Sequence, residues 1–191
     1  MFRTIASVIA FAASASVAAS VAAEPFTPVA PVAPGPALPT PRLTPVACAV
    51  DPAIASITLT KGSRPGQVRV SYQIVNRGRS AWRSGDGQQL VNMRAVNNNT
   101  GGAFTSSAAL ASRAAAGAVM QRFLSPFIDN AFDAFEFGGE VEVAIAYDPD
   151  ILIDGNRCND DINPANNSAR VSTDQVVDFL GGGATSRTFR F

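Results

Sequence analysis

Apolar and polar side chains alternate most clearly between Gly139 and Tyr147. Val141, Val143, Ile145 and Tyr147 alternate there with Glu140, Glu142, Ala144 and Ala146. Because successive side chains of a β-strand point to opposite faces, this period of two predicts a half-buried strand. The strand should end at Asp148-Pro149-Asp150, since proline has no backbone N–H to donate to a sheet and aspartate favours turns.

Shorter segments of β-branched or alternating apolar residues, separated by turn residues, predict further strands. They cover residues 54–59, 67–75, 88–96, 103–107, 118–124 and 168–173, the last continued in one interpretation by residues 176–180. About seven short strands with turns roughly ten residues apart are typical of an antiparallel sandwich. We therefore predict an all-β fold, an immunoglobulin-like antiparallel β-sandwich of about seven strands with Greek-key connectivity.

The N-terminal part of the 191-residue chain is predicted to precede the domain. Residues 1–23 have the form of a secretory signal peptide, with Arg3 before an Ala-rich apolar stretch and Val21-Ala22-Ala23 as a small-residue cleavage site. A retained membrane anchor is the alternative, but Ala and Ser insert weakly. Residues 24–47 carry eight prolines and predict a semi-rigid linker, either a stalk or a solvated segment without a role.

The remaining chain is long enough for one ordinary domain with its own core. We assign residues 48–180 to the β-sandwich. Residues 181–191 begin with three glycines, which predict a flexible tail.

Net charge argues against a nucleic-acid partner. The chain has 15 basic and 15 acidic residues, and loss of the signal peptide removes one base, which leaves a net charge near −1. Binding nucleic acid would require a strong excess of Lys and Arg on one face. Basic residues predominate between Lys61 and Arg122, and acidic residues between Asp129 and Asp161. We expect cross-strand pairing to neutralise most of them; the alternative is an acidic end that attracts cations.

Cys48 and Cys158 are the only cysteines, and an even number in a secreted chain favours a disulfide bond. With immunoglobulin-like connectivity assumed, the two residues fall at the same end of the sandwich. Their separation of about 110 residues gives an expected stabilisation of about 4 to 5 kcal/mol. The alternative is two unpaired thiols. Signal peptide and disulfide together predict a periplasmic or extracellular protein with no transmembrane helix in the mature chain.

Two short motifs at the ends of predicted strands carry a family resemblance. They are Tyr72-Gln73-Ile74-Val75-Asn76-Arg77-Gly78, and Tyr147-Asp148-Pro149-Asp150-Ile151-Leu152-Ile153-Asp154 with a closing Asn166-Asn167. Together they resemble the signatures of CARDB-type domains, the cell-adhesion-related domain found in bacteria, although residues 157–164 are inserted here. The resemblance spans about residues 51–173. It implies an extracytoplasmic immunoglobulin-like sandwich, often attached to adhesins or secreted enzymes, with no activity of its own.

Clustered carboxylates in the long return after residue 147 make calcium the one candidate metal. Calcium takes about six to eight oxygen ligands, which Asp and Asn side chains supply. The candidate ligands are Asp148, Asp150, Asp154, Asp160 and Asp161. The apolar run 151–153 breaks the ligand spacing of an EF-hand, so the alternative is turn chemistry, in which Asp and Asn bond to their own backbone. No other cofactor is expected.

Aromatic residues supply two candidate binding surfaces. Residues 127–138 are expected to form a loop or one short helix, with Phe132 and Phe135 on one apolar stripe. If exposed, these two rings form a contact patch for a partner or a membrane surface; if buried, they close the core. Trp82, among three arginines, either stacks on a sugar or anionic ligand or plugs the end of the sandwich.

Histidine is absent from the chain, which excludes Ser-His-Asp and Cys-His nucleophilic sites and removes the usual zinc ligands. We therefore predict no enzymatic activity and a secreted binding, adhesion or spacer module of the bacterial cell envelope, with a protein or surface glycan as partner. The alternative is a small extracytoplasmic carbohydrate-active enzyme or its accessory domain, which Trp82 and two carboxylates lining one groove would favour. A third interpretation is an envelope protein that self-associates through edge strands.

Overall fold

The computed structural model describes residues 48–191, so the predicted signal peptide (1–23) and Pro-rich linker (24–47) lie outside the described residues. The elements are β1 (Pro52–Lys61), β2 (Val68–Asn76), β3 (Trp82–Arg83), β4 (Gln89–Asn97), β5 (Ala103–Ala109), β6 (Arg113–Ala114), β7 (Val119–Leu124), β8 (Gly139–Tyr147), η1 (Pro149–Leu152), η2 (Pro164–Asn166), β9 (Ser168–Val171), α1 (Thr173–Gly181) and β10 (Ser186–Arg190). None of the described helices is long and apolar enough to cross a membrane.

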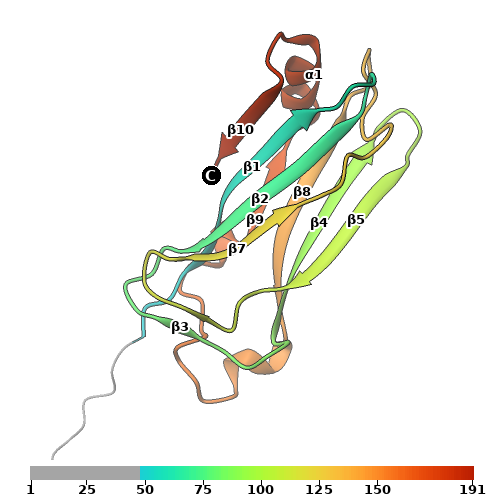
Figure 1. Ribbon diagram of the computed structural model, residues 1–191. Coiled ribbons are helices and arrows are strands. Elements are labelled where there is room, and N and C mark those ends of the chain that lie inside the picture. The colour runs from blue at the N-terminus through green and yellow to red at the C-terminus, as the bar shows by residue number, and fades with distance from the viewer. Residues whose placement is uncertain (1–47) are drawn as a thin grey trace, which may run out of the picture. The chain divides into compact units, whose positions relative to one another are not determined.

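Eight strands form two antiparallel sheets of four strands each, laid face to face (Figure 1). One sheet has the strand order β10-β1-β2-β7, and the other has the order β5-β4-β8-β9. The short strands β3 and β6 pair with each other at the end of the sandwich where Cys48 lies. The predicted all-β antiparallel sandwich is confirmed, and the β3–β6 ribbon is an addition to it.

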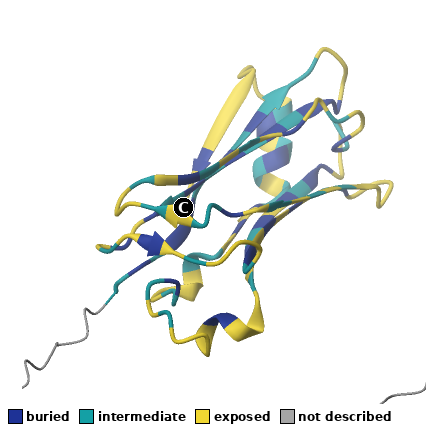
Figure 2. Ribbon diagram, turned by 60° about the horizontal axis from the view of Figure 1, so that its bottom comes forward, coloured by how far each residue is buried: buried dark blue, intermediate teal, exposed yellow. Residues whose placement is uncertain are grey.

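The alternation seen in the sequence becomes the core between the sheets. In β2 the buried Val70 and Ile74 alternate with the less buried Arg69, and in β8 the buried Val141 and Val143 flank the exposed Glu142. Figure 2 shows such buried positions repeating along the strands, with many of the exposed residues in the loops. Each aliphatic side chain that is fully buried stabilises the fold by about 1.5 to 3 kcal/mol, so the two inner faces hold the sheets together.

Asn76 joins several segments at the Cys48 end through one buried side chain. Its Oδ1 accepts hydrogen bonds from the backbone N–H groups of Asp51 (3.2 Å) and Gly78 (3.0 Å). Its Nδ2 donates to the carbonyl oxygens of Ser80 (2.8 Å) and Ala115 (3.2 Å). A side chain at Gly78 would collide with the backbone that leads into β1. The Asn-x-Gly part of the sequence motif therefore has a structural reason in this chain.

Opposite charges meet across the strands of the β5-β4-β8-β9 sheet. Glu142 of β8 lies opposite Arg94 of β4 on one side and Arg170 of β9 on the other. Arg170 also forms an ion pair with Glu140. The expected neutralisation is thus seen on this face as one ion pair and two cross-strand neighbours of opposite charge, and exposed pairs of this kind contribute only about 0 to 1 kcal/mol each.

The segment after β9 is a helix, so the interpretation of residues 176–180 as a continued strand is wrong. A capping box starts α1: the Ser172 hydroxyl accepts from the Gln175 N–H (3.4 Å), and the Gln175 side chain accepts from the Ser172 N–H (2.9 Å). Val176 and Phe179, three residues apart and therefore on one helical face, are buried against the core.

The prediction that residues 181–191 form a flexible tail is also wrong. They contain β10, which pairs antiparallel with β1 and places Phe189 opposite Ile57. Phe189 is buried, and the Lys61 ammonium donates to the carbonyl oxygen of Leu180 (2.9 Å) in the last turn of α1, just before the segment that leads to β10. The domain therefore extends beyond residue 180 to the end of this strand.

Replacement of Phe189 by alanine is expected to destabilise the domain by about 3 kcal/mol, because the ring fills a buried position and its removal leaves a cavity. Phe191, two residues later in the same segment, is partly exposed. Its replacement by alanine should cost less than about 1 kcal/mol. Urea unfolding of the two variants measures the difference, and equal midpoints would show that β10 is not anchored through Phe189.

Candidate functional site

The residues singled out in the sequence divide between the two ends of the sandwich. One end holds Cys48, Cys158, Trp82 and the segment of residues 148–167, which we call the acidic return. The loop of residues 127–137, which we call the aromatic loop, lies at the other end, beside the turn after β4 and the start of α1. The structure therefore separates the candidates by the length of the strands.

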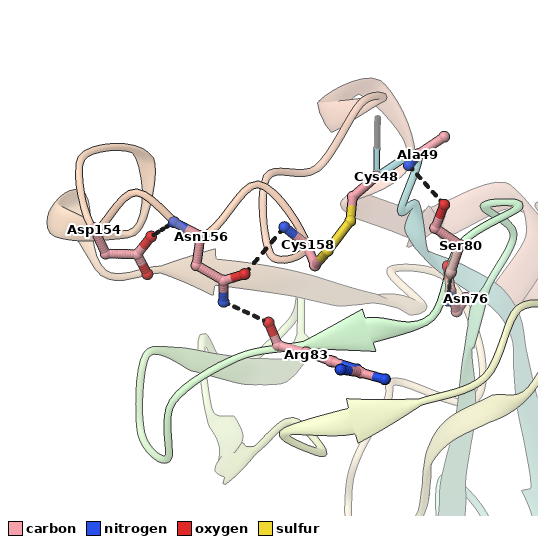
Figure 3. The surroundings of a disulfide bond; sticks show 8 residues. All are labelled: Cys48, Ala49, Asn76, Ser80, Arg83, Asp154, Asn156 and Cys158. Atoms are coloured by element: carbon pink, nitrogen blue, oxygen red, sulfur yellow. Dashed lines mark hydrogen bonds between the residues drawn. A yellow bond between two sulfur atoms is a disulfide. The ribbon is translucent and has the colours of Figure 1, made fainter. Parts of the chain in front are cut away.

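The predicted disulfide bond is confirmed. Cys48 and Cys158 are joined with their Cα atoms 5.0 Å apart (Figure 3). Asn156 supports the bond from the side: its Oδ1 accepts from the Cys158 N–H (3.1 Å), and its Nδ2 donates to the carbonyl oxygen of Arg83 (2.8 Å). The Arg83 N–H in turn donates to the Cys158 carbonyl (3.0 Å). The acidic return is thereby fixed to both β3 and the start of the domain.

The carboxylates of the acidic return bind their own loop. Asp154 accepts from Asn159 Nδ2 (2.7 Å) and from the Asn156 N–H (2.6 Å), and these hydrogen bonds hold its pKa below the usual value. Asp161 accepts from the Tyr147 hydroxyl (3.2 Å), while partial burial raises the pKa of its carboxyl. These contacts are turn chemistry, the alternative that the sequence left open.

The described residues therefore give no support to the predicted calcium ligation by this return. Within residues 48–191, no three His, Cys, Asp or Glu side chains gather closely enough to hold a metal ion. The candidate ligands Asp148, Asp150, Asp154, Asp160 and Asp161 do not converge. Ile151, in the middle of this return, is buried and belongs to the core.

Trp82 is fully buried, which corrects its assignment as a stacking surface for a ligand. Its Nε1 donates to the carbonyl oxygen of Ala111 (3.0 Å), and its ring packs at a tilt against Tyr147 with 6.3 Å between the ring centroids. The indole thus closes the end of the sandwich, which is the second of the two roles that the sequence allowed for Trp82. A hollow of about 720 Å³ at this end is lined by Trp82 with Arg83, Arg113 and Asn156, and none of the residues that line it carries a carboxylate.

The aromatic loop contains no helix and presents its phenylalanines unequally. Phe132, predicted as a binding residue, is buried at 1% exposure and belongs to the core, so this assignment is corrected. Phe135, predicted with it, is 86% exposed, and Phe137 is 49% exposed. Phe127 is partly exposed beneath the guanidinium of Arg69, which lies 4.1 Å from its ring centroid. The helical stripe of the sequence is therefore split by the turn between residues 132 and 135.

Asp133 fixes the turn that displays Phe135. Its carboxylate accepts from the backbone N–H groups of Phe135 (3.0 Å), Glu136 (2.8 Å) and Phe137 (3.1 Å), and from Asn99 Nδ2 (2.9 Å). These hydrogen bonds, the one from the Glu136 N–H foremost, stabilise the charged form and lower the pKa of Asp133 to about 2. The exposed ring therefore stands on a turn whose backbone is already ordered.

Two glycines let the aromatic loop close onto the sandwich. Gly138 has a φ of 56°, in the left-handed region that glycine adopts without strain, and a side chain there would collide with Val177 of α1. A side chain at Gly139 would collide with the ring of Phe132. Only glycine at both positions allows β8 to begin directly beneath the buried ring.

Beside Phe135 the surface is hollowed by a depression of about 460 Å³. Its lining combines polar groups of the β4–β5 turn and the aromatic loop with two rings, among them Asn97, Asn99, Asn130, Asp133, Phe132 and Phe135. A projecting ring beside a hydrogen-bonding hollow can engage a partner by both shape and polarity.

One exposed group was not assigned from the sequence. Leu152, Ile153 and Ile162 are 72%, 79% and 59% exposed at the Cys48 end. The run 151–153 is apparent in the sequence, but there it served only to exclude an EF-hand. Asp133 was likewise not assigned, although an aspartate in a loop that ends in glycine is a turn signal, because its carboxylate can accept the backbone N–H two residues later.

Comparison with family models, curated proteins and solved structures found no match for this chain. The resemblance to CARDB-type domains thus stays a prediction from two motifs. The disulfide bond fits a protein that matures outside the reducing cytoplasm.

Replacement of both cysteines by alanine is expected to lower the free energy of unfolding by about 4 kcal/mol, because the unfolded chain regains the entropy of a loop of 110 residues. Urea unfolding of the oxidised parent and of the Cys48→Ala/Cys158→Ala variant measures the loss. Reductant should destabilise the parent and leave the double variant unchanged. An unchanged parent under reductant would contradict a stabilising bond.

Acidification is expected to loosen the aromatic loop between about pH 4 and pH 2. The folded pKa of Asp133 lies below its ordinary value of 3.8, so its stabilising contribution is complete above that value and is lost as the pH falls through about 2. NMR titration of the carboxyl measures this pKa directly, and hydrogen exchange measures the protection of the Phe135 and Phe137 amides. Asp86→Asn, in an exposed loop at the other end, serves as control. An ordinary Asp133 pKa would contradict the bonded turn.

Proposed function

We propose that this chain is a secreted, non-enzymatic binding module whose aromatic loop contacts a protein of the cell envelope. The single observation that carries the proposal is Phe135, a large apolar side chain exposed by 86% on a turn held by the Asp133 carboxylate. An ordered turn loses little conformational entropy when it binds, and a rigid aromatic side chain is the kind of residue that dominates binding energy at interfaces.

The shape of the aromatic loop favours a protein over a small ligand. Small molecules bind in concave sites that bury most of their surface, whereas Phe135 projects and would itself enter a pocket of the partner. Phe137 and Phe127 add partly exposed apolar area, and the adjacent depression offers amide groups from Asn99 and Asn130 for the polar rim of such a contact. A surface glycan is the other partner class that the experiment below separates.

The position of the aromatic loop suits presentation at a distance. The described domain is entered through Cys48 at one end of the sandwich, and the aromatic loop lies at the other end. With a Pro-rich linker before Cys48 and a signal peptide before the linker, as the sequence predicts, the exposed rings would face away from the attachment point. The disulfide bond supports the extracytoplasmic location that this arrangement requires.

We also propose that the sandwich is immunoglobulin-like with Greek-key connectivity. The support is the strand order: β1, β2 and β7 fit strands A, B and E of one sheet, and β4, β8 and β9 fit strands C, F and G of the other. The buried Asn76 and the close approach at Gly78 add support for the CARDB-type resemblance.

An activity of its own is not part of this proposal. The chain has no histidine, and the carboxylates that a carbohydrate-active site would use are bonded within their own turns. The buried indole of Trp82 removes the aromatic platform on which the alternative, a carbohydrate-active enzyme or its accessory domain, depended.

Loss of the exposed rings should weaken binding while the fold is kept. We expect Phe135→Ser/Phe137→Ser to weaken saturable binding of the purified chain to isolated bacterial cell envelopes by at least about tenfold. The reason is that an aromatic residue at the centre of an interface contributes about 1 kcal/mol or more to the binding free energy. Leu152→Ser/Ile153→Ser removes a similar apolar area at the other end and is the matched control. Co-sedimentation with increasing protein measures both variants.

Pretreatment of the envelopes identifies the partner class. Protease should remove the binding sites, whereas periodate oxidation of sugars should leave them. Binding that survives protease and is lost after periodate would assign a glycan instead. Equal binding by the aromatic-loop variant and the control would contradict the proposed role of the aromatic loop, as would a parent that shows no saturable binding.

A further inference from the structure

The four outer strands of the two sheets differ in how they are protected against pairing with another strand. Natural proteins protect such edges with charged side chains, irregular register or very short strands. β10 carries Arg187 and Arg190, β7 carries Arg122 and pairs with β2 through a register shift, and β9 has only four residues. β5, by contrast, has seven residues with no charge and no proline, and its register with β4 is unbroken.

The outward-facing backbone groups of β5 follow from its ladder with β4. Leu110 N–H donates to the Gln89 carbonyl (3.2 Å), and Asn97 N–H donates to the Gly102 carbonyl (2.9 Å). Hydrogen-bonded pairs alternate along an antiparallel ladder, so the even-numbered residues of β5 bond to β4. The N–H and C=O groups of the odd-numbered residues Ala103, Thr105, Ser107 and Ala109 therefore point away from the sheet.

We propose that β5 pairs with β5 of a second copy of this chain, antiparallel about a two-fold axis at Ser106. This register alone places all four outward residues in hydrogen-bonded pairs: Thr105 opposite Ser107 and Ala103 opposite Ala109, each in both directions. A register shifted by two residues leaves one of the four on each strand without a partner. A shift by one residue places core-facing side chains opposite solvent-facing ones.

The side chains of β5 complement each other in the same register. Phe104, Ser106 and Ala108 lie on the core-facing side, opposite buried residues of β4, and are half-buried. Across the two-fold axis Phe104 meets Ala108 of the second copy, a large residue beside a small one, and Ser106 meets Ser106. The half-exposed ring of Phe104 would thereby gain cover, with no like charges on the paired strands.

Such a dimer would carry its two aromatic loops at opposite ends, because the two-fold axis reverses the direction of the paired strands. Each aromatic loop would lie beside the disulfide end of the other copy. A dimer of this kind can bridge two partners. The pairing itself rests only on β5 and is independent of what the aromatic loops bind.

Sedimentation tests the pairing. The purified chain should dimerise reversibly with a dissociation constant on the order of 100 μM, as expected for a small interface between two strands. Thr105→Pro removes an outward N–H and none that bonds to β4, so it should raise this constant at least about tenfold without unfolding the domain. Thr105→Val keeps the N–H and is the matched control. A chain that stays monomeric up to about 1 mM would overturn the proposal.

Cross-linking tests the register. The Ser106→Cys residues of two copies would face each other across a pair that is not hydrogen-bonded, at a Cα separation of about 4.5 Å that a disulfide can span. Ser107→Cys would face Thr105 instead and serves as control. Rapid oxidation of Ser106→Cys alone to a covalent dimer is expected. Equal cross-linking of both variants, or of neither, would overturn the two-fold axis at Ser106, and circular dichroism confirms that each variant is folded.

Discussion

Burial of one shared apolar layer between two sheets is the constraint on which the rest of this structure depends. Neither sheet has a second covered face, so each strand must send alternate side chains toward the other sheet. Strands of both sheets meet this requirement with Val, Ile, Leu and Met, and α1 adds the ring of Phe179. Because this layer fixes the strands, it also fixes where the connecting loops lie, and the two ends become available for different tasks.

Polar groups hold the ends where the apolar layer stops. At one end the buried amide of Asn76, the indole N–H of Trp82 and the disulfide bond connect loops that have few apolar contacts of their own. At the other end the carboxylate of Asp133 serves a single turn with several hydrogen bonds. Aspartate accepts backbone N–H groups at both ends, Asp133 in the aromatic loop and Asp154 in the acidic return. A sequence pattern of clustered aspartates therefore predicts turns as well as metal sites.

The sequence predicted those parts of the structure that local pattern determines. A period of two located β2, β4 and β8 to within a residue or two, and cysteine count with compartment predicted the Cys48–Cys158 bond. The sequence-based prediction was wrong for elements whose structure is determined by contacts with distant parts of the chain. The apolar residues of α1 fit a short strand as well as a helix until the cap at Ser172 is considered, and β10 has only Phe189 to mark it.

The aromatic loop shows the same limit at the candidate site. Phe132 and Phe135 share one helical stripe in the sequence, yet one is in the core and the other in solvent. The decision is made by Asp133 between them, whose carboxylate captures the following N–H groups and breaks the helical period. For Trp82 the sequence left two interpretations open, a ligand platform or a plug of the sandwich end, because its partner carbonyl at Ala111 is distant in the chain.

The location of the disulfide has a mechanical meaning. Tension on the segment before Cys48, with the far end of the domain held, would enter the fold at a covalent cross-link and divide between β1 and the loop around Cys158. β1 runs along the sandwich between β2 and β10. The load would therefore shear the backbone hydrogen bonds to both neighbouring strands together, instead of breaking them one after another. Force applied along the strands would therefore act on many backbone hydrogen bonds of β1 together.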